Sequence, residues 1–149
     1  MYFNGNNHEF GNELIAKTRS FVWTKAEYAV SMQSSASLAV YILNNLCYVF
    51  GSANFMNAEA AFTTLITSLP RPYNNVEWTQ PYLNMATGNF EPSSVMVYPY
   101  SGDEGRFQSR QAMTSTGSGG MYLGFVYEIE QTWLQRLDNG EFNSYITAL

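Results

Sequence analysis

Charged side chains are what this chain of 149 residues has least of, since Asp, Glu, Lys and Arg together make up 13% of it. Globular proteins usually carry about 25%. Few charges give weak repulsion between copies, and therefore weak protection against association. The polar surface must then be built from Ser, Thr, Asn, Gln, Tyr and Gly. This composition favours a protein that works inside an oligomer or a particle, although secreted enzymes and binding domains share it.

Basic charge is especially scarce. Seven Lys and Arg residues stand against 12 Asp and Glu residues, which gives a formal net charge of −5. Direct binding of nucleic acid needs a basic stripe that neutralises several phosphates, and the sequence has none, so no such partner is expected. The one basic cluster, Lys17, Arg19 and Lys25, falls in a segment of helical spacing. We interpret it as a solvated helix face, with a docking site for an acidic partner as the alternative.

Cys47 is the only cysteine, so no internal disulfide framework exists. Cysteine content therefore does not distinguish an oxidising compartment from a reducing one. A nucleophilic cysteine needs an electropositive, partly exposed setting and a base. Cys47 lies in an apolar run, and the single histidine, His8, is distant in sequence. We therefore expect a buried, inert thiol. The alternative, a Cys47–His8 pair, predicts fast alkylation by iodoacetamide at neutral pH.

The sequence also lacks a long hydrophobic run. A membrane-spanning helix needs about 20 apolar residues. The most apolar stretch, Leu38–Phe50, is shorter and contains Asn44 and Asn45. We expect it to be a buried helix rather than a membrane span. The N-terminus has no basic region followed by an apolar one, so no signal peptide is expected.

Apolar and aromatic residues are plentiful, at 46% and 16% of the chain. This content predicts a folded core and argues against disorder. The length favours one domain. We expect an irregular arm over residues 1–11 and a single domain over residues 12–149. Phe3 and Phe10 are candidate anchors through which a neighbouring subunit orders the arm.

The first half of the domain is predicted to be helical. Apolar residues at helical spacing predict a helix over Asn12–Met32. A second is expected over Ala36–Phe50, apolar on almost every side, as is typical of a helix at the centre of a fold or of an interface. A third is expected from Asn54 or Asn57 through Leu69, where prolines follow.

The second half is predicted to be mainly β over residues 76–130, with a short helical C-terminus over residues 131–149. Strands are expected at Val76–Thr79, Ser93–Tyr98, Arg106–Thr114 and Met121–Glu130, the last with clean alternation. The last two are expected to form an antiparallel hairpin around the loop TSTGSGG. Helices followed by strands predict an α+β fold, with N-terminal helices packed on a small antiparallel sheet.

No residue pattern establishes a catalytic, cofactor or metal site. TSTGSGG lacks the lysine of a phosphate-binding loop. Glu128 and Glu130 share one face of a strand, about 7 Å apart, as a glycosidase pair or an ordinary exposed acidic pair does. Asp103 and Glu104 form either a weak calcium site or a plain solvated turn.

Candidate interface residues come from three places: the arm, the apolar segment and the loop. Asn44 and Asn45 either fix the register of packed helices or face solvent. The full set is Phe3, Phe10, Tyr41, Asn44, Asn45, Tyr48, Thr116, Gly117, Ser118 and Gly119.

The middle of the chain resembles the tail-terminator proteins of long-tailed bacteriophages. The resemblance is carried by a predicted helix that ends near Leu-Pro, Phe62–Leu69 with Pro70; a strand with an aromatic residue, Val76–Trp78; an apolar strand ending in proline, Val95–Pro99; and the predicted hairpin Arg106–Glu130. It covers about half the chain. What the resemblance implies is a ring-forming virion subunit without catalysis.

The leading hypothesis is therefore a non-enzymatic assembly subunit of a virion, such as a phage tail or neck, or of a similar extracellular particle. Its partners would be copies of itself and other subunits, and no cofactor is expected. One alternative is an extracellular module that binds glycans or another surface through Trp78, Tyr98, Tyr100 or Tyr122. Another is a small hydrolase that uses Glu128 and Glu130, or Cys47.

Overall fold

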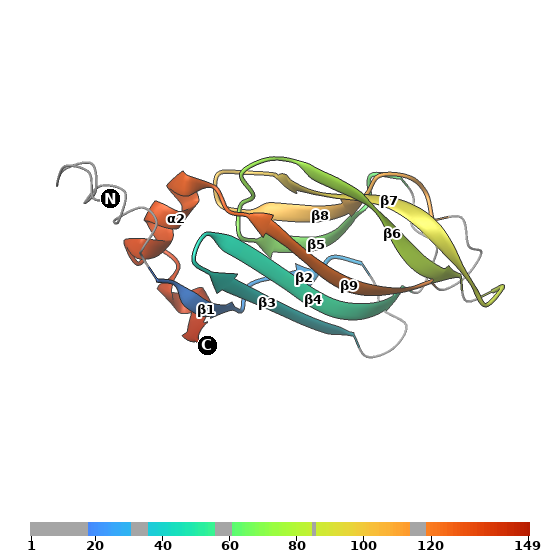
Figure 1. Ribbon diagram of the computed structural model, residues 1–149, viewed down its shortest axis with the longest axis horizontal. Helices are drawn as coiled ribbons and strands as arrows, with labels where there is room; N and C mark the ends of the chain where they lie inside the picture. The colour runs from blue at the N-terminus through green and yellow to red at the C-terminus, as the bar shows by residue number, and fades with distance from the viewer. Residues whose placement is uncertain (1–17, 31–35, 56–60, 85, 114–118) are drawn as a thin grey trace, which may run out of the picture.

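A computed structural model describes residues 18–30, 36–55, 61–84, 86–113 and 119–149 (Figure 1). These residues are mostly β. The strands are β1 (Ser20–Trp23), β2 (Glu27–Tyr28), β3 (Ser37–Leu43), β4 (Leu46–Phe55), β5 (Thr64–Leu69), β6 (Val76–Asn84), β7 (Asn89–Pro99), β8 (Gly105–Ser109), β9 (Gly119–Glu128) and β10 (Ile146–Ala148). Helix α2 (Gln131–Asp138) and the 3₁₀ turn η1 (Asn143–Tyr145) lie between β9 and β10.

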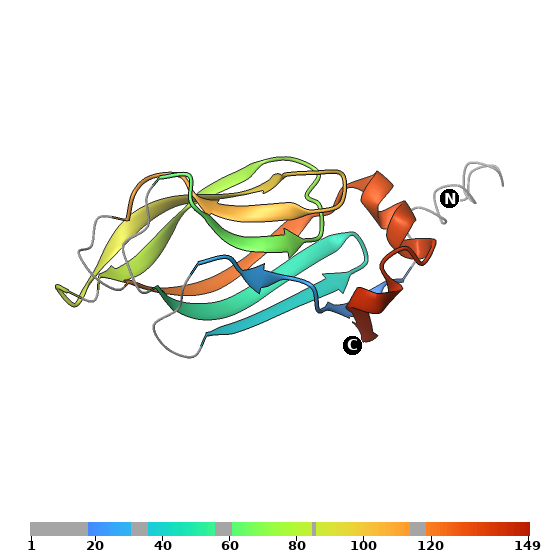
Figure 2. The ribbon, with the colours of Figure 1, turned by 180° about the vertical axis from the view of Figure 1, so that it is seen from behind.

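The strands form one antiparallel sheet in the order β10-β1-β3-β4-β9-β6-β7-β8-β5-β2. The sheet curls, so that β1, β3, β4 and β9 face β5, β6, β7 and β8 (Figure 1 and Figure 2). β9 and β6 pair only through Leu83 with Gly120 and Asn84 with Gly119. From that point the two halves diverge, and apolar side chains fill the space between them.

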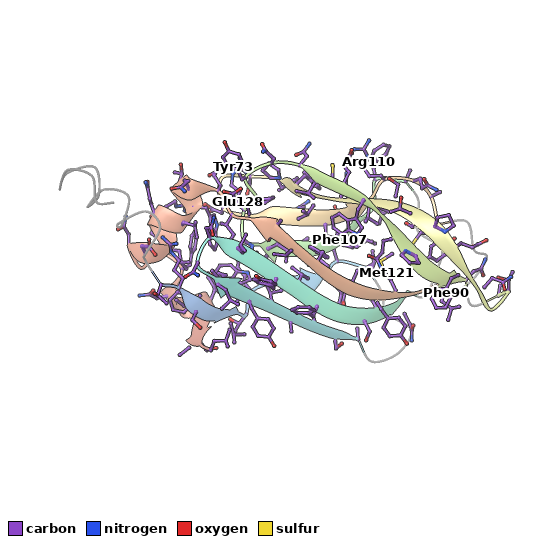
Figure 3. All side chains as sticks on the ribbon, in the orientation of Figure 1. Tyr73, Phe90, Phe107, Arg110, Met121 and Glu128 are labelled. Atoms are coloured by element: carbon purple, nitrogen blue, oxygen red, sulfur yellow. The ribbon has the colours of Figure 1, made fainter. Side chains whose placement is uncertain are left out.

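The core consists of the inward-facing side chains of both halves. Val49, Val97 and Phe107 are fully buried, and Met121 is 2% exposed. Figure 3 shows Phe107 and Met121 inside the curled sheet, while Tyr73 and Arg110 project outward. Helix α2 closes one end by burying Trp133, Leu134 and Leu137, as expected of a short helix in this region. Within the part of the chain that the structure describes, no helix is both long and apolar enough to span a membrane.

The predicted α+β fold, with N-terminal helices on a small sheet, is wrong. Ala36–Phe50 contains β3 and the first half of β4, which form a hairpin that turns at Asn44 and Asn45. Asn44 has φ 57°, in the left-handed region that asparagine tolerates better than most residues. Both faces of the hairpin are apolar, so the sequence shows no alternation of apolar and polar residues that would reveal a strand. The β-branched and aromatic content of the run favours strands over a helix.

The predicted third helix is also wrong, because its second half is strand β5. Leu65, Ile66 and Leu69 are buried. β5 pairs with β8 through register shifts after Thr64 and after Ile66, and Ser68 has φ 58°. These irregularities place on one face residues whose sequence spacing imitates a helical stripe. A regular strand would have shown alternation instead.

The first predicted helix, Asn12–Met32, is wrong over its described part, which carries β1 and β2. Residues 12–17, 31 and 32 lie outside the described residues, as does the predicted arm over 1–11. The expected helical C-terminus, residues 131–149, contains α2 and η1 but ends in strand β10, which pairs with β1.

Three of the four strands predicted in the second half lie where they were expected, β8 covers only the start of the predicted strand Arg106–Thr114, and one predicted pairing is wrong. β6, β7 and β9 cover Val76–Thr79, Ser93–Tyr98 and most of Met121–Glu130. The expected hairpin between the last two predicted strands does not form. β8 pairs with β5 and β7, whereas β9 pairs with β4 and β6. Sequence proximity suggested the pairing, and burial of the β4 side chains against the core overrode it.

Candidate interaction surface

The outward side of β3, β4 and β9 is an apolar, aromatic surface. Alternation along each strand sends Val40, Val49 and Leu123 inward and their sequence neighbours outward. We call this surface the outer face; it consists of Ser37, Ala39, Tyr41, Leu43, Leu46, Tyr48, Phe50, Ser52, Tyr122, Gly124, Val126 and Glu128. Its most exposed large side chains are Tyr122 at 72%, Val126 at 48% and Phe50 at 46%.

Cross-strand pairing arranges the centre of the outer face in rows. Tyr41, Tyr48 and Val126 form one row, and Ala39, Phe50 and Gly124 form the next. The rings of Tyr41 and Phe50 lie 6.2 Å apart, centroid to centroid. Aromatic and β-branched cross-strand pairs of this kind support the sheet. They also leave a continuous band of apolar surface in contact with solvent.

Charge is nearly absent from the outer face, where Glu128 is the one residue of the charged types (Asp, Glu, Lys and Arg) among the twelve that define it. Ion pairs lie elsewhere on the molecule. Those among the described residues are Arg19–Asp138, Arg71–Glu130, Arg106–Glu104, Arg110–Glu77, Arg136–Asp103 and Arg136–Glu141. A large apolar area without charge is typical of a surface that another molecule covers.

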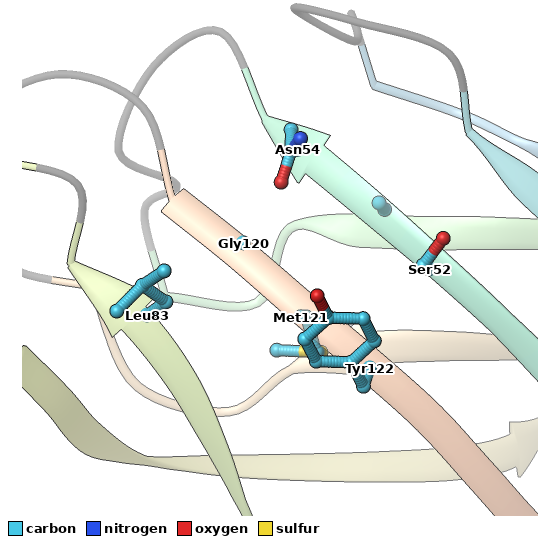
Figure 4. Close-up of a pocket in the computed structure, with 7 residues that line it drawn as sticks. Ser52, Asn54, Leu83, Gly120, Met121 and Tyr122 are labelled. Carbon is cyan, nitrogen blue, oxygen red and sulfur yellow. The ribbon is translucent and has the colours of Figure 1, made fainter.

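A small pocket of about 80 Å³ lies at the end of the outer face, where β4, β9 and β6 meet (Figure 4). It is lined by Ser52, Ala53, Asn54, Leu83, Gly120, Met121 and Tyr122. Gln80 lies beside it, because its Nε2 donates a hydrogen bond of 2.7 Å to the carbonyl oxygen of Tyr122. The lining is neutral and combines one exposed aromatic ring with hydroxyl and amide groups.

The predicted interface residues have different locations. Tyr41 and Tyr48 lie on the outer face, half-buried by their neighbours. Gly119 starts β9 and pairs with Phe55 and Asn84. Phe3, Phe10, Thr116, Gly117 and Ser118 lie outside the described residues.

Asn44 and Asn45 are exposed turn residues, so the interpretation that they fix helix register is wrong. The backbone N–H of Asn44 donates to the Arg19 carbonyl at 2.9 Å, and the Asn44 carbonyl accepts from the Arg19 guanidinium at 3.2 Å. The carbonyl of Asn45 accepts from the Ile129 N–H at 2.8 Å. These two residues therefore stabilise the hairpin turn within the chain.

The thiol of Cys47 is fully buried, as the sequence predicted. Burial raises its pKa to about 12, although a hydrogen bond with Tyr127 acts in the opposite direction. The hydroxyl of Tyr127 donates to the Pro70 carbonyl at 2.7 Å. Cys47 is therefore protonated at neutral pH and inert. His8, the base of the alternative hypothesis, lies outside the described residues.

The acidic candidates are separated or already paired. Glu128 lies exposed on the outer face, whereas Glu130 forms an ion pair of 2.7 Å with Arg71 beyond the end of β9. Asp103 pairs with Arg136 at 2.6 Å, and a Glu104 carboxylate oxygen accepts from the Ser68 N–H at 2.7 Å. No group of three or more His, Cys, Asp or Glu residues in the described ranges is arranged to hold a metal ion.

The aromatic candidates for glycan binding are mostly engaged. Trp78 packs against Phe125, with ring centroids 4.8 Å apart. Tyr98 is half-buried, and the Arg106 guanidinium stacks 3.4 Å from the centroid of Tyr100. Tyr122 remains, with a ring that is mostly exposed beside the pocket.

Phe50, Gly124 and Val126 are members of the outer face that sequence reasoning missed as interface candidates. The signal for Gly124 and Val126 was present in the alternation of the last strand. For Phe50 it was the same alternation in β4, obscured because the segment was interpreted as a helix.

The chain was compared with family models, curated proteins and solved structures, and nothing in any of the three matches it.

Proposed function

We propose that the protein is a non-enzymatic assembly subunit that associates with copies of itself through the outer face. The observation that carries this proposal is the exposure of Phe50, Tyr122 and Val126 on one nearly uncharged surface. Fully burying a Phe or Val side chain contributes about 1.5–3 kcal/mol, and each of these side chains has much of that still to gain. A second copy supplies a surface of the same kind.

The distribution of charge supports a copy of the chain as the partner. With a net charge of −5, two copies repel unless their charged regions stay apart. Contact through the outer face leaves all the ion pairs named above away from the interface centre. A strongly charged partner would find only one charged group on the outer face with which to pair, the carboxylate of Glu128.

Within this class we propose a subunit of a virion or of a similar extracellular particle. The resemblance of the central segments to tail-terminator proteins supports this narrower form. Of the four segments that carry the resemblance, Val76–Trp78 and Val95–Pro99 lie in the neighbouring strands β6 and β7. The predicted helix at Phe62–Leu69 is replaced by β5, and the predicted hairpin does not form.

A matched pair of valine variants tests the proposal. Val126 on the outer face and Val76 on β6 are 48% and 38% exposed, so lysine is tolerated sterically at both. We expect Val126→Lys to remove self-association, because it buries a charge against an apolar surface, and Val76→Lys to leave it unchanged. Light scattering over a concentration series measures both. A monomeric wild-type chain, or equal behaviour of the two variants, would contradict the proposal.

Glycan binding is a second candidate, favoured by the exposed Tyr122 ring beside a neutral pocket. Flat aromatic rings pack against sugar faces, and Ser52 and Asn54 offer hydrogen-bonding groups next to it. Titration with a panel of neutral oligosaccharides, followed by the NMR signals of the Tyr122 ring, tests this candidate. Shifts that Tyr122→Ala abolishes support it, and unchanged signals across the panel remove it.

A further inference from the structure

Gly124 is a glycine for which the fold of the chain gives no reason. A Cβ atom at Gly51 would lie 2.4 Å from the Ser37 carbonyl oxygen, and one at Gly105 would lie 2.3 Å from Pro72. At Gly124 the nearest atom would be Phe50 Cδ1, at an ordinary contact distance of 3.8 Å. Gly124 also lacks the positive φ of Gly88 and Gly140. A Cβ atom therefore fits at this position in the isolated chain without displacing a neighbour.

A glycine inside a strand weakens it, and such a glycine often marks a place where another molecule approaches closely. Gly124 lies near the middle of β9 on the outer face, directly across from Phe50 on β4. The glycine therefore leaves a hollow beside a projecting aromatic ring. The hollow opens to solvent, so it can receive a side chain of a partner that packs on the outer face.

The central row and the row toward Ser52 alternate large and small side chains, whereas the row on the other side, Tyr48 with Val126, carries two large ones. Phe50 on β4 is large and Gly124 on β9 is small; in the next row Ser52 on β4 is small and Tyr122 on β9 is large. Facing layers that interdigitate require large side chains opposite small ones. In these two rows the large and small positions exchange strands, so this part of the surface complements itself.

We infer that two copies pack face to face about a two-fold axis that lies between β4 and β9 and runs along the strands. This rotation places β4 of one copy over β9 of the other. Phe50 then packs over the partner's Gly124, and Tyr122 packs over the partner's Ser52. Self-complementary contacts of this kind are what a two-fold interface requires. The inference rests on the proposed function and specifies how its contact is made.

The same axis explains the position of the one charged side chain. Packed sheets cross at about 30° because each is twisted, so contact is closest at the centre and the ends diverge. Phe50 and Gly124 form the central row, whereas Glu128 lies at the end of β9 opposite Leu46. The rotation brings Glu128 toward the end of the partner's β4, not toward the partner's Glu128. Both carboxylates therefore stay hydrated at the rim.

Exchanging the large and small residues tests this pairing. We expect Phe50→Ala to weaken dimerisation at least about tenfold by removing the projecting ring, and Gly124→Phe to do the same by filling the hollow. The double variant puts a ring on β9 and a hollow on β4, so it should restore the dissociation constant to within about threefold of wild type. Sedimentation equilibrium gives the constants, and near-ultraviolet circular dichroism checks folding.

A second exchange keeps the inference testable if one of these variants fails to fold. Ser52→Tyr should weaken dimerisation by opposing the partner's Tyr122, and addition of Tyr122→Ser should restore it. Single variants that weaken association without rescue by the double variants would overturn the two-fold pairing while leaving self-association intact. Wild-type chains that stay monomeric would overturn the proposed function itself, and this inference with it.

Discussion

At the scale of the residue, three buried or half-buried groups, Cys47, Tyr127 and Tyr28, keep their protons more strongly than they would in water. Burial raises the pKa of Cys47 to about 12, and it raises the pKa of Tyr127 well above its ordinary value. Tyr28 also has a pKa of about 12, again because of burial. Its hydroxyl donates to the Ser37 carbonyl at 2.7 Å and connects β2 to β3, beside a glycine that leaves room for it.

These raised pKa values predict a loss of stability in alkaline solution. The folded chain keeps the Cys47 proton up to about pH 12, whereas an exposed thiol loses it near its ordinary pKa of 9.0. The contribution of these groups to the free energy of unfolding should therefore be constant below about pH 9 and fall above it, with Cys47 contributing at most about 1.4 kcal/mol per pH unit.

Urea unfolding between pH 8 and pH 11 checks this dependence. Above pH 9, the free energy of unfolding of Cys47→Ala should fall less steeply than that of wild type, because only the tyrosines then contribute to the slope. Wild-type stability that rises with pH, or parallel curves for the two proteins, would contradict the assignment. The constant difference caused by the changed side-chain volume does not affect the slopes.

At the scale of the element, single strands and the helix could be predicted where one face is polar. Met121–Glu130 alternates because its outward side carries Tyr122, Gly124 and Glu128. Leu38–Phe50 could not be identified in this way, because both of its sides are apolar. One side faces the core, and the other belongs to the apolar outer face. The element that misled the prediction is thus the one that carries the candidate surface. Strand pairing could not be predicted either, because it depends on distant segments meeting across the core.

The attachment of α2 to the sheet provides a prediction at this scale. The guanidinium of Arg19, just before β1, donates to both carboxylate oxygens of Asp138 at 2.8 and 2.6 Å. The two side chains are 10% and 15% exposed. We expect Asp138→Ala to lower the free energy of unfolding by about 3 kcal/mol, because it leaves the arginine charge buried without its partner.

The exposed pair Arg110–Glu77 is the matched control, since the Glu77 side chain is 53% exposed. Glu77→Ala should change the free energy of unfolding by less than about 1 kcal/mol. Chemical denaturation of both variants at neutral pH measures the difference. Similar losses in the two would show that the Arg19–Asp138 pair does not attach α2 to the sheet.

At the scale of the whole molecule, the two ends of the described sheet offer little edge for pairing with another chain. The terminal strands, β10 and β2, have three and two residues, and short edge strands limit such pairing. The ion pairs lie away from the outer face. The curled sheet therefore has one nearly uncharged, aromatic side, which is the side on which we propose that a second copy packs.

Hydroxyl-radical footprinting read by mass spectrometry, in dilute and concentrated solution, tests this account most directly. Phe50 and Tyr122 should lose reactivity as the protein is concentrated, because a second copy covers them. Phe62 and Tyr100, exposed at 63% and 52%, pack against Arg110 and Arg106 in the other half of the sheet and should keep theirs. Reactivity of Phe50 and Tyr122 that does not change with concentration, or protection confined to Phe62 and Tyr100, would contradict the central claim.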